Sequence, residues 1–183
     1  MTARRLQKKI VLLGDPAVGK TSLIQNFVYG VFDDRYLATF GAKITKKSLI
    51  FPAVQYPDIE GIEDTELLLL VWDIAGQKAF KTVHQAYYRG AEAAIIVCDV
   101  TRPETLQHVP EWVNDLYEAV GKVPIILLVN KCDLTGQVRF GDKEIAEIIS
   151  QFGIYYYFSS AKTGHNVEDA FKTLSEFIIG ARK

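Results

Sequence analysis

Residues 9–30, "KIVLLGDPAVGKTSLIQNFVYG", constrain the fold more than any other part of the chain. A short apolar run leads into Gly14–Thr21, which matches the pattern G-x-x-x-x-G-K-[S/T], and apolar residues at helical spacing follow. Glycines let such a backbone wrap around phosphates, and the N–H groups at the start of the helix point at the anion. The segment therefore predicts a strand, a phosphate-binding loop and a helix.

Further apolar runs have the continuous hydrophobic pattern of strands buried on both faces. They span residues 66–74, 93–100, 124–130 and 154–160. Between and after them, helical spacing recurs at residues 110–121, 142–153 and 166–180. Strands that alternate with helices predict an α/β fold, a three-layer sandwich with a mostly parallel sheet of about six strands and helices on both faces. Ligands of such folds bind at the carboxyl ends of the strands.

The composition is that of one globular domain. The chain has 183 residues, of which 49% are hydrophobic and 23% are charged, with a net charge of −1. This near-neutral charge argues against nucleic acid as a partner. Two cysteines and three histidines form neither a disulfide framework nor a metal-ligand pattern. Because no membrane span, signal peptide, myristoylation site or C-terminal prenylation cysteine is visible, we expect a cytoplasmic protein without an intrinsic lipid anchor.

The first two strand ends carry phosphate and metal chemistry. Lys20 supplies a positive charge for the β- and γ-phosphates, and Thr21 offers a hydroxyl to Mg²⁺. Asp73 ends a neighbouring strand, where P-loop proteins hold Mg²⁺ through water. After it, Gly76 gives the backbone freedom to meet a γ-phosphate, and Gln77 is placed to orient a water for in-line attack. The turn "DIAG" alone is weak evidence, and its value lies in its position after a buried strand.

The last two strand ends favour guanine. The Asp133 carboxylate can accept both the N1–H and the exocyclic amine of guanine, whereas adenine offers no such pair. Lys131 can lie along the base, and Asn130 is short enough to tie the loops together. In the turn "SAK", residues 160–162, the N–H of Ala161 can donate to guanine O6. Four such turns in this order favour a guanine nucleotide over ATP.

The stretches "GDPAVGKT", "WDIAGQ", "AYYRGA", "NKCDL" and "SSAKTGHNVEDAF" resemble, in order and spacing, the small GTPases of the Ras superfamily and within it the Rab branch. The resemblance covers about residues 8–180. It implies the P-loop NTPase fold, a single G domain over residues 1–183, and a monomeric switch that binds GTP or GDP with Mg²⁺ and hydrolyses GTP slowly. It also implies effectors, exchange factors and GTPase-activating proteins that bind switch loops 31–47 and 73–85, and it allows membranes to be reached through partners.

The resemblance assigns roles residue by residue. Thr39 joins Mg²⁺ when the γ-phosphate is present, Phe32 packs edge-on against guanine, and Tyr36 covers the phosphates. The implied catalytic residues are Gln77, Lys20 and Thr39. The implied metal ligands are Thr21, Thr39 and, through water, Asp73. The implied nucleotide-binding residues are Asp15, Ala17, Val18, Gly19, Lys20, Thr21, Ser22, Phe32, Tyr36, Gly76, Asn130, Lys131, Asp133, Ser160, Ala161 and Lys162.

The chain departs from the family pattern at several places. Lys78 stands where an acid usually helps exchange factors eject nucleotide, which argues against the familiar exchange factors. Residues 48–66 are longer than the usual hairpin, so we expect an insertion, either a solvated loop or a partner surface. Tyr36 stands where the Gα branch carries its own catalytic arginine. We therefore expect a partner protein to supply the arginine, which raises the hydrolysis rate by about 10³–10⁵-fold. Pro16 lacks an N–H, and we expect it to affect rate more than affinity.

Three functional hypotheses follow from the sequence. The leading one is a GTP-hydrolysing molecular switch. The alternative is a non-catalytic GTP/GDP-binding interaction module that uses the same site as a structural core, which the joint presence of Gln77, Thr39 and Asp73 disfavours. A third is an ATP-dependent small-molecule kinase, which shares the phosphate loop but has no need for "NKCD" and "SAK".

Overall fold

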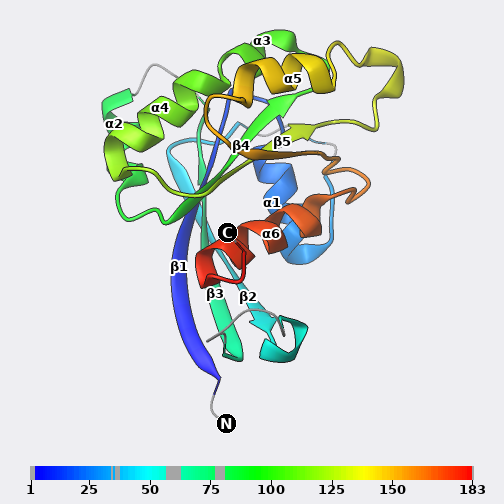
Figure 1. Cartoon of the computed structure of the whole chain (residues 1–183). Coiled ribbons are helices and arrows are strands. Elements are labelled where there is room, and N and C mark those ends of the chain that lie inside the picture. Colours follow the sequence, from blue (N-terminus) through cyan, green and yellow to red (C-terminus); the bar gives the residue numbers. More distant parts are fainter. Residues whose placement is uncertain (1–2, 34, 36–37, 57–62, 77–80, 183) are drawn as a thin grey trace.

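A computed structural model describes residues 3–33, 35, 38–56, 63–76 and 81–182 of the chain, without the side chains of residues 81–84. Figure 1 shows a central sheet flanked by helices. The six strands lie in the order β2-β3-β1-β4-β5-β6; only β2 runs antiparallel to its neighbour. They are β1 (Arg4–Leu13), β2 (Ala42–Phe51), β3 (Thr65–Ile74), β4 (Ala93–Asp99), β5 (Ile125–Asn130) and β6 (Tyr155–Phe158). The predicted α/β fold with a mostly parallel sheet is confirmed.

Helices cover both faces of the sheet, as the sequence predicts. On one face lie α1 (Lys20–Tyr29) and α6 (Val167–Ile179). On the other lie α2 (Lys81–Tyr88), α3 (Pro103–Gln107), α4 (Val109–Val120) and α5 (Asp142–Ile149). Single 3₁₀ turns occur at Ala53–Gln55 and Thr135–Gln137. The helices predicted at residues 110–121 and 166–180 are found within one residue of their predicted bounds, as α4 and α6. The helix predicted at residues 142–153 is α5, which ends four residues earlier, at Ile149.

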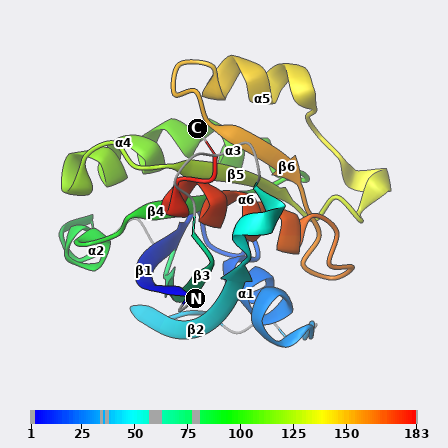
Figure 2. The same ribbon diagram turned by 60° about the horizontal axis from the view of Figure 1, so that its bottom comes forward.

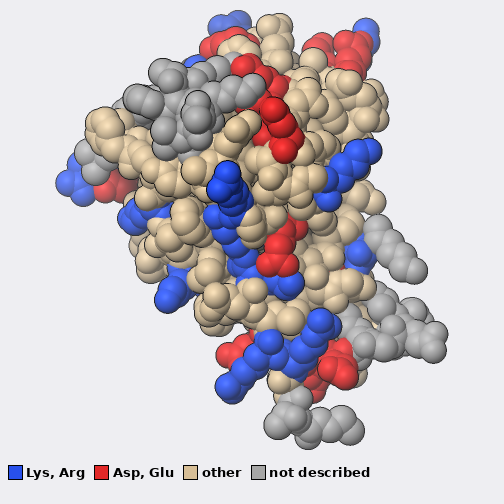
Figure 3. Space-filling model, turned by 90° about the vertical axis from the view of Figure 1, so that its left-hand side faces the viewer, with Lys and Arg blue, Asp and Glu red and all other residues tan. Residues whose placement is uncertain are grey.

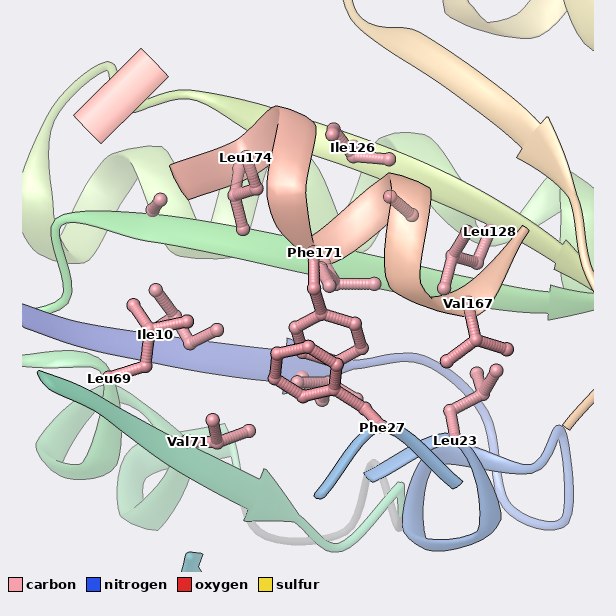
Figure 4. Close-up of a cluster of buried hydrophobic side chains, with 14 of the residues drawn as sticks. Ile10, Leu23, Phe27, Leu69, Val71, Ile126, Leu128, Val167, Phe171 and Leu174 are labelled. Carbon is pink, nitrogen blue, oxygen red and sulfur yellow. The ribbon is translucent and has the colours of Figure 1, made fainter. Parts of the chain in front are cut away.

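Two hydrophobic cores fill the space between the sheet and its helices. Along β1, Ile10 and Leu12 enter the core beneath α1 and α6, while Val11 and Leu13 enter the core beneath the opposite helices. A strand buried on both faces needs apolar residues at every position, which explains the continuous runs in the sequence. In the first core the rings of Phe27 and Phe171 stack with their centroids 3.9 Å apart (Figure 4).

The β2–β3 hairpin accounts for part of the predicted insertion. The pairing continues from Ala42 opposite Ile74 to Phe51 opposite Thr65, so residues 48–51 and 65–66 are strand residues. The connection therefore spans residues 52–64, of which 57–62 lie outside the described residues. Its described start folds back toward α6 (Figure 2). The Tyr56 hydroxyl donates to Glu176 Oε1 of that helix at 3.0 Å.

Charged side chains of both signs share the surface on the side of β1 and α2. Figure 3 shows lysines and arginines beside acidic residues on this face. Two of the basic residues of β1 form ion pairs, Arg5 with Glu66 at 3.0 Å and Lys8 with Glu92 at 2.5 Å. Within the described ranges, no helix has the length and apolar character needed to cross a membrane.

The stacked pair in the first core gives a stability prediction. Phe171→Ala should lower the free energy of unfolding by about 3–5 kcal/mol, because it removes a fully buried ring and leaves a cavity against Phe27. Urea unfolding at a fixed GDP concentration measures the loss. Phe177→Ala is the matched control on the same helix; its half-buried ring contacts Tyr155, so its loss should be smaller. Equal losses would contradict the prediction.

Candidate functional site

A cavity of about 620 Å³ lies at the carboxyl ends of the parallel strands. Turns that follow β1, β3, β5 and β6 meet there, together with the described part of residues 31–47. Most of the predicted site residues line it. They are Ala17, Gly19, Lys20, Thr21, Ser22, Phe32, Thr39, Gly76, Asn130, Lys131, Asp133, Ala161 and Lys162.

The phosphate loop has a shape that its glycines permit. Gly14 and Gly19 adopt φ of 135° and 103°, values that side chains disfavour, and Ala17 adopts the left-handed region at φ 61°. A Cβ at Gly14 would lie 2.2 Å from the Val97 carbonyl oxygen of β4. A Cβ at Gly76 would lie 2.5 Å from the Gly14 oxygen. The loop is thus pressed between the ends of β3 and β4.

Lys20 closes the loop from inside. Its Nζ donates to the carbonyl oxygens of Gly14 and Asp15, at 2.7 and 2.8 Å. Burial lowers the pKa of Lys20 to about 8, although the Asp73 and Asp15 carboxylates favour the charged form. A buried ammonium at the floor of an open cavity is suited to bind a phosphate, which would supply the compensating negative charge.

Three oxygen-bearing side chains converge beside Lys20. The Thr21 hydroxyl lies 2.9 Å from the Thr39 hydroxyl and donates to Asp73 Oδ2 at 2.5 Å. Asp73 Oδ1 is buried and has no hydrogen-bond partner among the described residues. Burial raises the pKa of Asp73, opposed by the Thr21 hydrogen bond and the Lys20 charge. Hard oxygens around an unsatisfied carboxylate fit Mg²⁺, which keeps several waters and takes few protein ligands.

The opposite end of the cavity is built by the turns after β5 and β6. Asn130 Nδ2 donates to Val18 O at 2.9 Å, and its Oδ1 accepts the Ala161 N–H at 3.2 Å, so one amide joins three turns. Lys131, at φ 67°, places Nζ 2.8 Å from Ala17 O. The same Nζ forms an ion pair with the buried Asp99 carboxylate at 2.7 Å, which fixes the lysine stem along the rim of the cavity.

Asp133 is held in one orientation by its neighbour. The Ser160 hydroxyl donates to Asp133 Oδ1 at 2.6 Å and accepts the Thr163 N–H at 3.1 Å. Ser160 is buried behind Asp133 and does not line the cavity. A carboxylate fixed in this way presents its acceptors without losing side-chain freedom when a ligand arrives.

Other predicted site residues lie elsewhere. The Val18 side chain is fully buried, so only its backbone reaches the loop surface. The Asp15 carboxylate turns away from the cavity toward Trp112 and His108. Gln77 and Tyr36 lie outside the described residues. Sequence reasoning missed Arg102, whose Nη1 donates to Pro16 O at 3.0 Å from the turn after β4.

A phosphate loop and a magnesium-type oxygen cluster, set at the carboxyl ends of a parallel sheet, define a P-loop nucleotide-binding protein. Residues 9–179 match the sequence model of the Ras family. The chain is 34% identical to the Ras-related protein Rab-13 of Canis lupus familiaris over 93% of its own length and 79% of that protein. It is 35% identical to human Ras-related protein Rab-19, over 93% and 75% of the two lengths.

The plant relative RABA4b of Arabidopsis thaliana is also 35% identical, over 91% of this chain and 70% of that protein. The chain therefore belongs to the Ras family and is similar to its Rab members. It is a GTP-binding molecular switch and a GTP hydrolase that works with Mg²⁺.

The lowered pKa of Lys20 predicts how nucleotide binding depends on pH. A bound phosphate favours the charged ammonium. Below pH 8 the ammonium is already charged, but above about pH 8 binding must take up a proton. GDP affinity should therefore fall as the pH rises through about 8. Calorimetric titrations from pH 7 to 9, in buffers of different ionisation enthalpy, measure both the affinity and the proton uptake.

Lys20→Arg is the control for this titration, because a guanidinium stays charged above pH 12. Binding of GDP by this variant should not be accompanied by proton uptake, whatever affinity the variant retains. A wild-type affinity that stays constant from pH 7 to 9 would contradict the prediction.

Proposed function

We propose that the cavity binds guanine nucleotide through the predicted site residues and that the chain hydrolyses GTP with Gln77 orienting the attacking water. The observation that carries this proposal is the convergence of four separate turns on one cavity of about 620 Å³. The phosphate end holds Lys20, and the far end holds Asp133 with one oxygen fixed by Ser160. Such an arrangement supports a ligand with phosphates at one end and a base with paired donors at the other.

Each residue has a task in the proposed reaction. Lys20 moves its ammonium from the Gly14 and Asp15 carbonyls to the β- and γ-phosphates. Thr21, Thr39 and Asp73 hold Mg²⁺, which, when bound, neutralises charge on those phosphates. Gln77 aligns a water whose oxygen attacks the γ-phosphorus. The bond from that phosphorus to the bridging oxygen breaks, and GDP leaves with the electron pair. The water gives a proton to an oxygen of the transferred phosphate, which leaves as inorganic phosphate.

Hydrolysis then acts as a switch. We propose that the γ-phosphate holds Thr39 and Gly76, so that its loss releases loops 31–47 and 73–85. The described part of the first loop exposes apolar side chains, with Phe40 84% exposed and Ile44 49% exposed. These features support effectors, exchange factors and GTPase-activating proteins as partners of the two loops.

The arginine for fast hydrolysis is proposed to come from a partner. Arg35, the arginine closest in sequence to Thr39, pairs with Asp33 at 2.8 Å. We further propose that the chain acts as a monomeric single domain with an insertion in the β2–β3 connection. It would reach membranes from the cytoplasm through its partners.

Replacement of Gln77 tests the catalytic assignment. Gln77→Leu should slow single-turnover GTP hydrolysis by about tenfold or more, because a leucine cannot orient water in the transition state. GTP and GDP affinities should stay close to those of the wild type. The measurement is phosphate release from preloaded protein after Mg²⁺ is added. Equal rates in the two proteins would refute the role of Gln77, and no turnover in either would favour the non-catalytic binding module.

Replacement of Asp133 tests the base assignment. Asp133→Asn should weaken GDP binding and favour xanthosine diphosphate, because an amide donates where the carboxylate accepted. Competition titrations with GDP, XDP and ADP measure the preference. Asp142→Asn is a matched control, since Asp142 is an exposed aspartate that accepts from the Tyr156 hydroxyl and does not line the cavity. An unchanged preference in Asp133→Asn, with ADP bound by the wild type, would instead indicate an ATP-dependent kinase.

A further inference from the structure

The segment that follows β4 holds the phosphate loop from outside the cavity. Its three contacts come from residues at the start of α3 and of α4. Arg102 Nη1 donates to Pro16 O at 3.0 Å, Trp112 Nε1 donates to Asp15 Oδ1 at 3.0 Å, and His108 Nδ1 lies 2.6 Å from Asp15 Oδ2. Because a carboxylate only accepts, that histidine nitrogen carries a proton.

The Asp15 carboxylate is committed to these contacts. Asp15 is 5% exposed, and both of its oxygens have a donor from the segment after β4. The N-terminus of α4, which begins at Val109, lies next to His108 and adds a favourable partial positive charge. A buried carboxylate with two donors is strongly oriented, since the loss of either one would leave an unsatisfied charge.

Arg102 is oriented in the same way. Its Nε donates to Glu104 Oε1 at 3.0 Å, which aims the guanidinium at the phosphate loop. Pro16 lines the cavity and has no N–H, so its carbonyl is the one backbone group through which hydrogen bonding can hold it. Arg102 uses that group.

These outer contacts become more important when the cavity fills. Lys20 holds Gly14 and Asp15 from inside, but the proposed reaction moves its ammonium to the phosphates. The loop also contains Ala17 in the left-handed region at φ 61°, which its own sequence does not favour. The contacts of Arg102 and His108 do not face the nucleotide, so they remain in place after Lys20 has turned to the phosphates.

We infer that Arg102 and His108 are positioning residues, which act through Pro16 and Asp15 to hold the phosphate loop around the nucleotide and thereby slow its release. The inference rests on the proposed nucleotide site and adds to it two residues that contact no nucleotide. Both side chains are partly exposed, Arg102 36% and His108 38%, so their replacement spares the two hydrophobic cores.

Two single variants test the inference. Arg102→Ala and His108→Ala should each speed the release of fluorescent GDP by on the order of tenfold, the effect of one hydrogen bond to a charged group. Each should also shift the ³¹P resonances of bound GDP, because the phosphates would sit in an altered loop. A purely structural role would not move these resonances. Arg102→Lys and His108→Gln, which keep a donor, should restore part of the wild-type behaviour.

Matched controls come from the same surface. Gln107→Ala changes the exposed neighbour of His108, and Arg139→Ala removes an exposed arginine side chain while it keeps the Arg139 N–H bond to Val100 O. Both should release GDP at the wild-type rate with wild-type ³¹P spectra. If His108→Ala fails to fold, Arg102→Ala and His108→Gln still decide the question, and thermal unfolding of each GDP-loaded protein identifies such failures.

Two results would overturn the inference. Alanine variants that match the wild type in GDP release and in ³¹P spectra would refute it, even if they unfold at a lower temperature. Wild-type protein that binds no guanine nucleotide would refute the proposed function and this inference together. Because the wild type is measured alongside the variants, the two failures are distinguishable.

Discussion

The buried ammonium of Lys20 is the interaction on which the rest of the site depends. A charge at 6% exposure is stable only among compensating groups, and the Gly14 and Asp15 carbonyls supply them. To bring those carbonyls to one nitrogen the loop must curl tightly, which requires the unusual backbone angles of its glycines. Loops of this shape present backbone N–H groups to a phosphate, and the nearby Asp73 adds negative charge where a cation can bind.

The sheet order explains why the other turns meet this loop. Strand β1 lies between β3 and β4, so the phosphate loop leaves the sheet at its middle and has a neighbour on each side. From β3 come Asp73 and Gly76, while β4 leads to Asp99 and then to Arg102. Strands β5 and β6 complete the edge with Asn130 and Asp133 on one turn and Ser160 on the other. Parallel strands bring all these carboxyl ends to one edge, although the residues are far apart in the chain.

Local patterns were enough to predict most of the fold and much of the site. Continuous apolar runs mark buried strands, and the motif residues that line the cavity follow directly from strand ends. The features that the sequence did not predict are contacts between residues far apart in the chain. The contacts of Asp15 with His108 and Trp112 join residues 93 and 97 positions apart, and no short motif encodes them. The sequence analysis placed residues 48–51 in an expected insertion, whereas they end β2, a strand in which exposed and covered residues alternate.

The role of Pro16 follows from how the phosphate loop divides its polar groups. The N–H groups of a phosphate loop are the ones that bind the anion, whereas the Pro16 carbonyl and the Asp15 side chain contact the segment that follows β4. A proline at position 16 removes one N–H donor but keeps its carbonyl, which accepts a hydrogen bond from Arg102. Proline also restricts φ in the unfolded chain, which favours the ordered loop. Pro16 lacks the N–H that most loop residues offer to a phosphate. It is nevertheless compatible with this loop, which Lys20 holds from inside the cavity and Arg102 from outside.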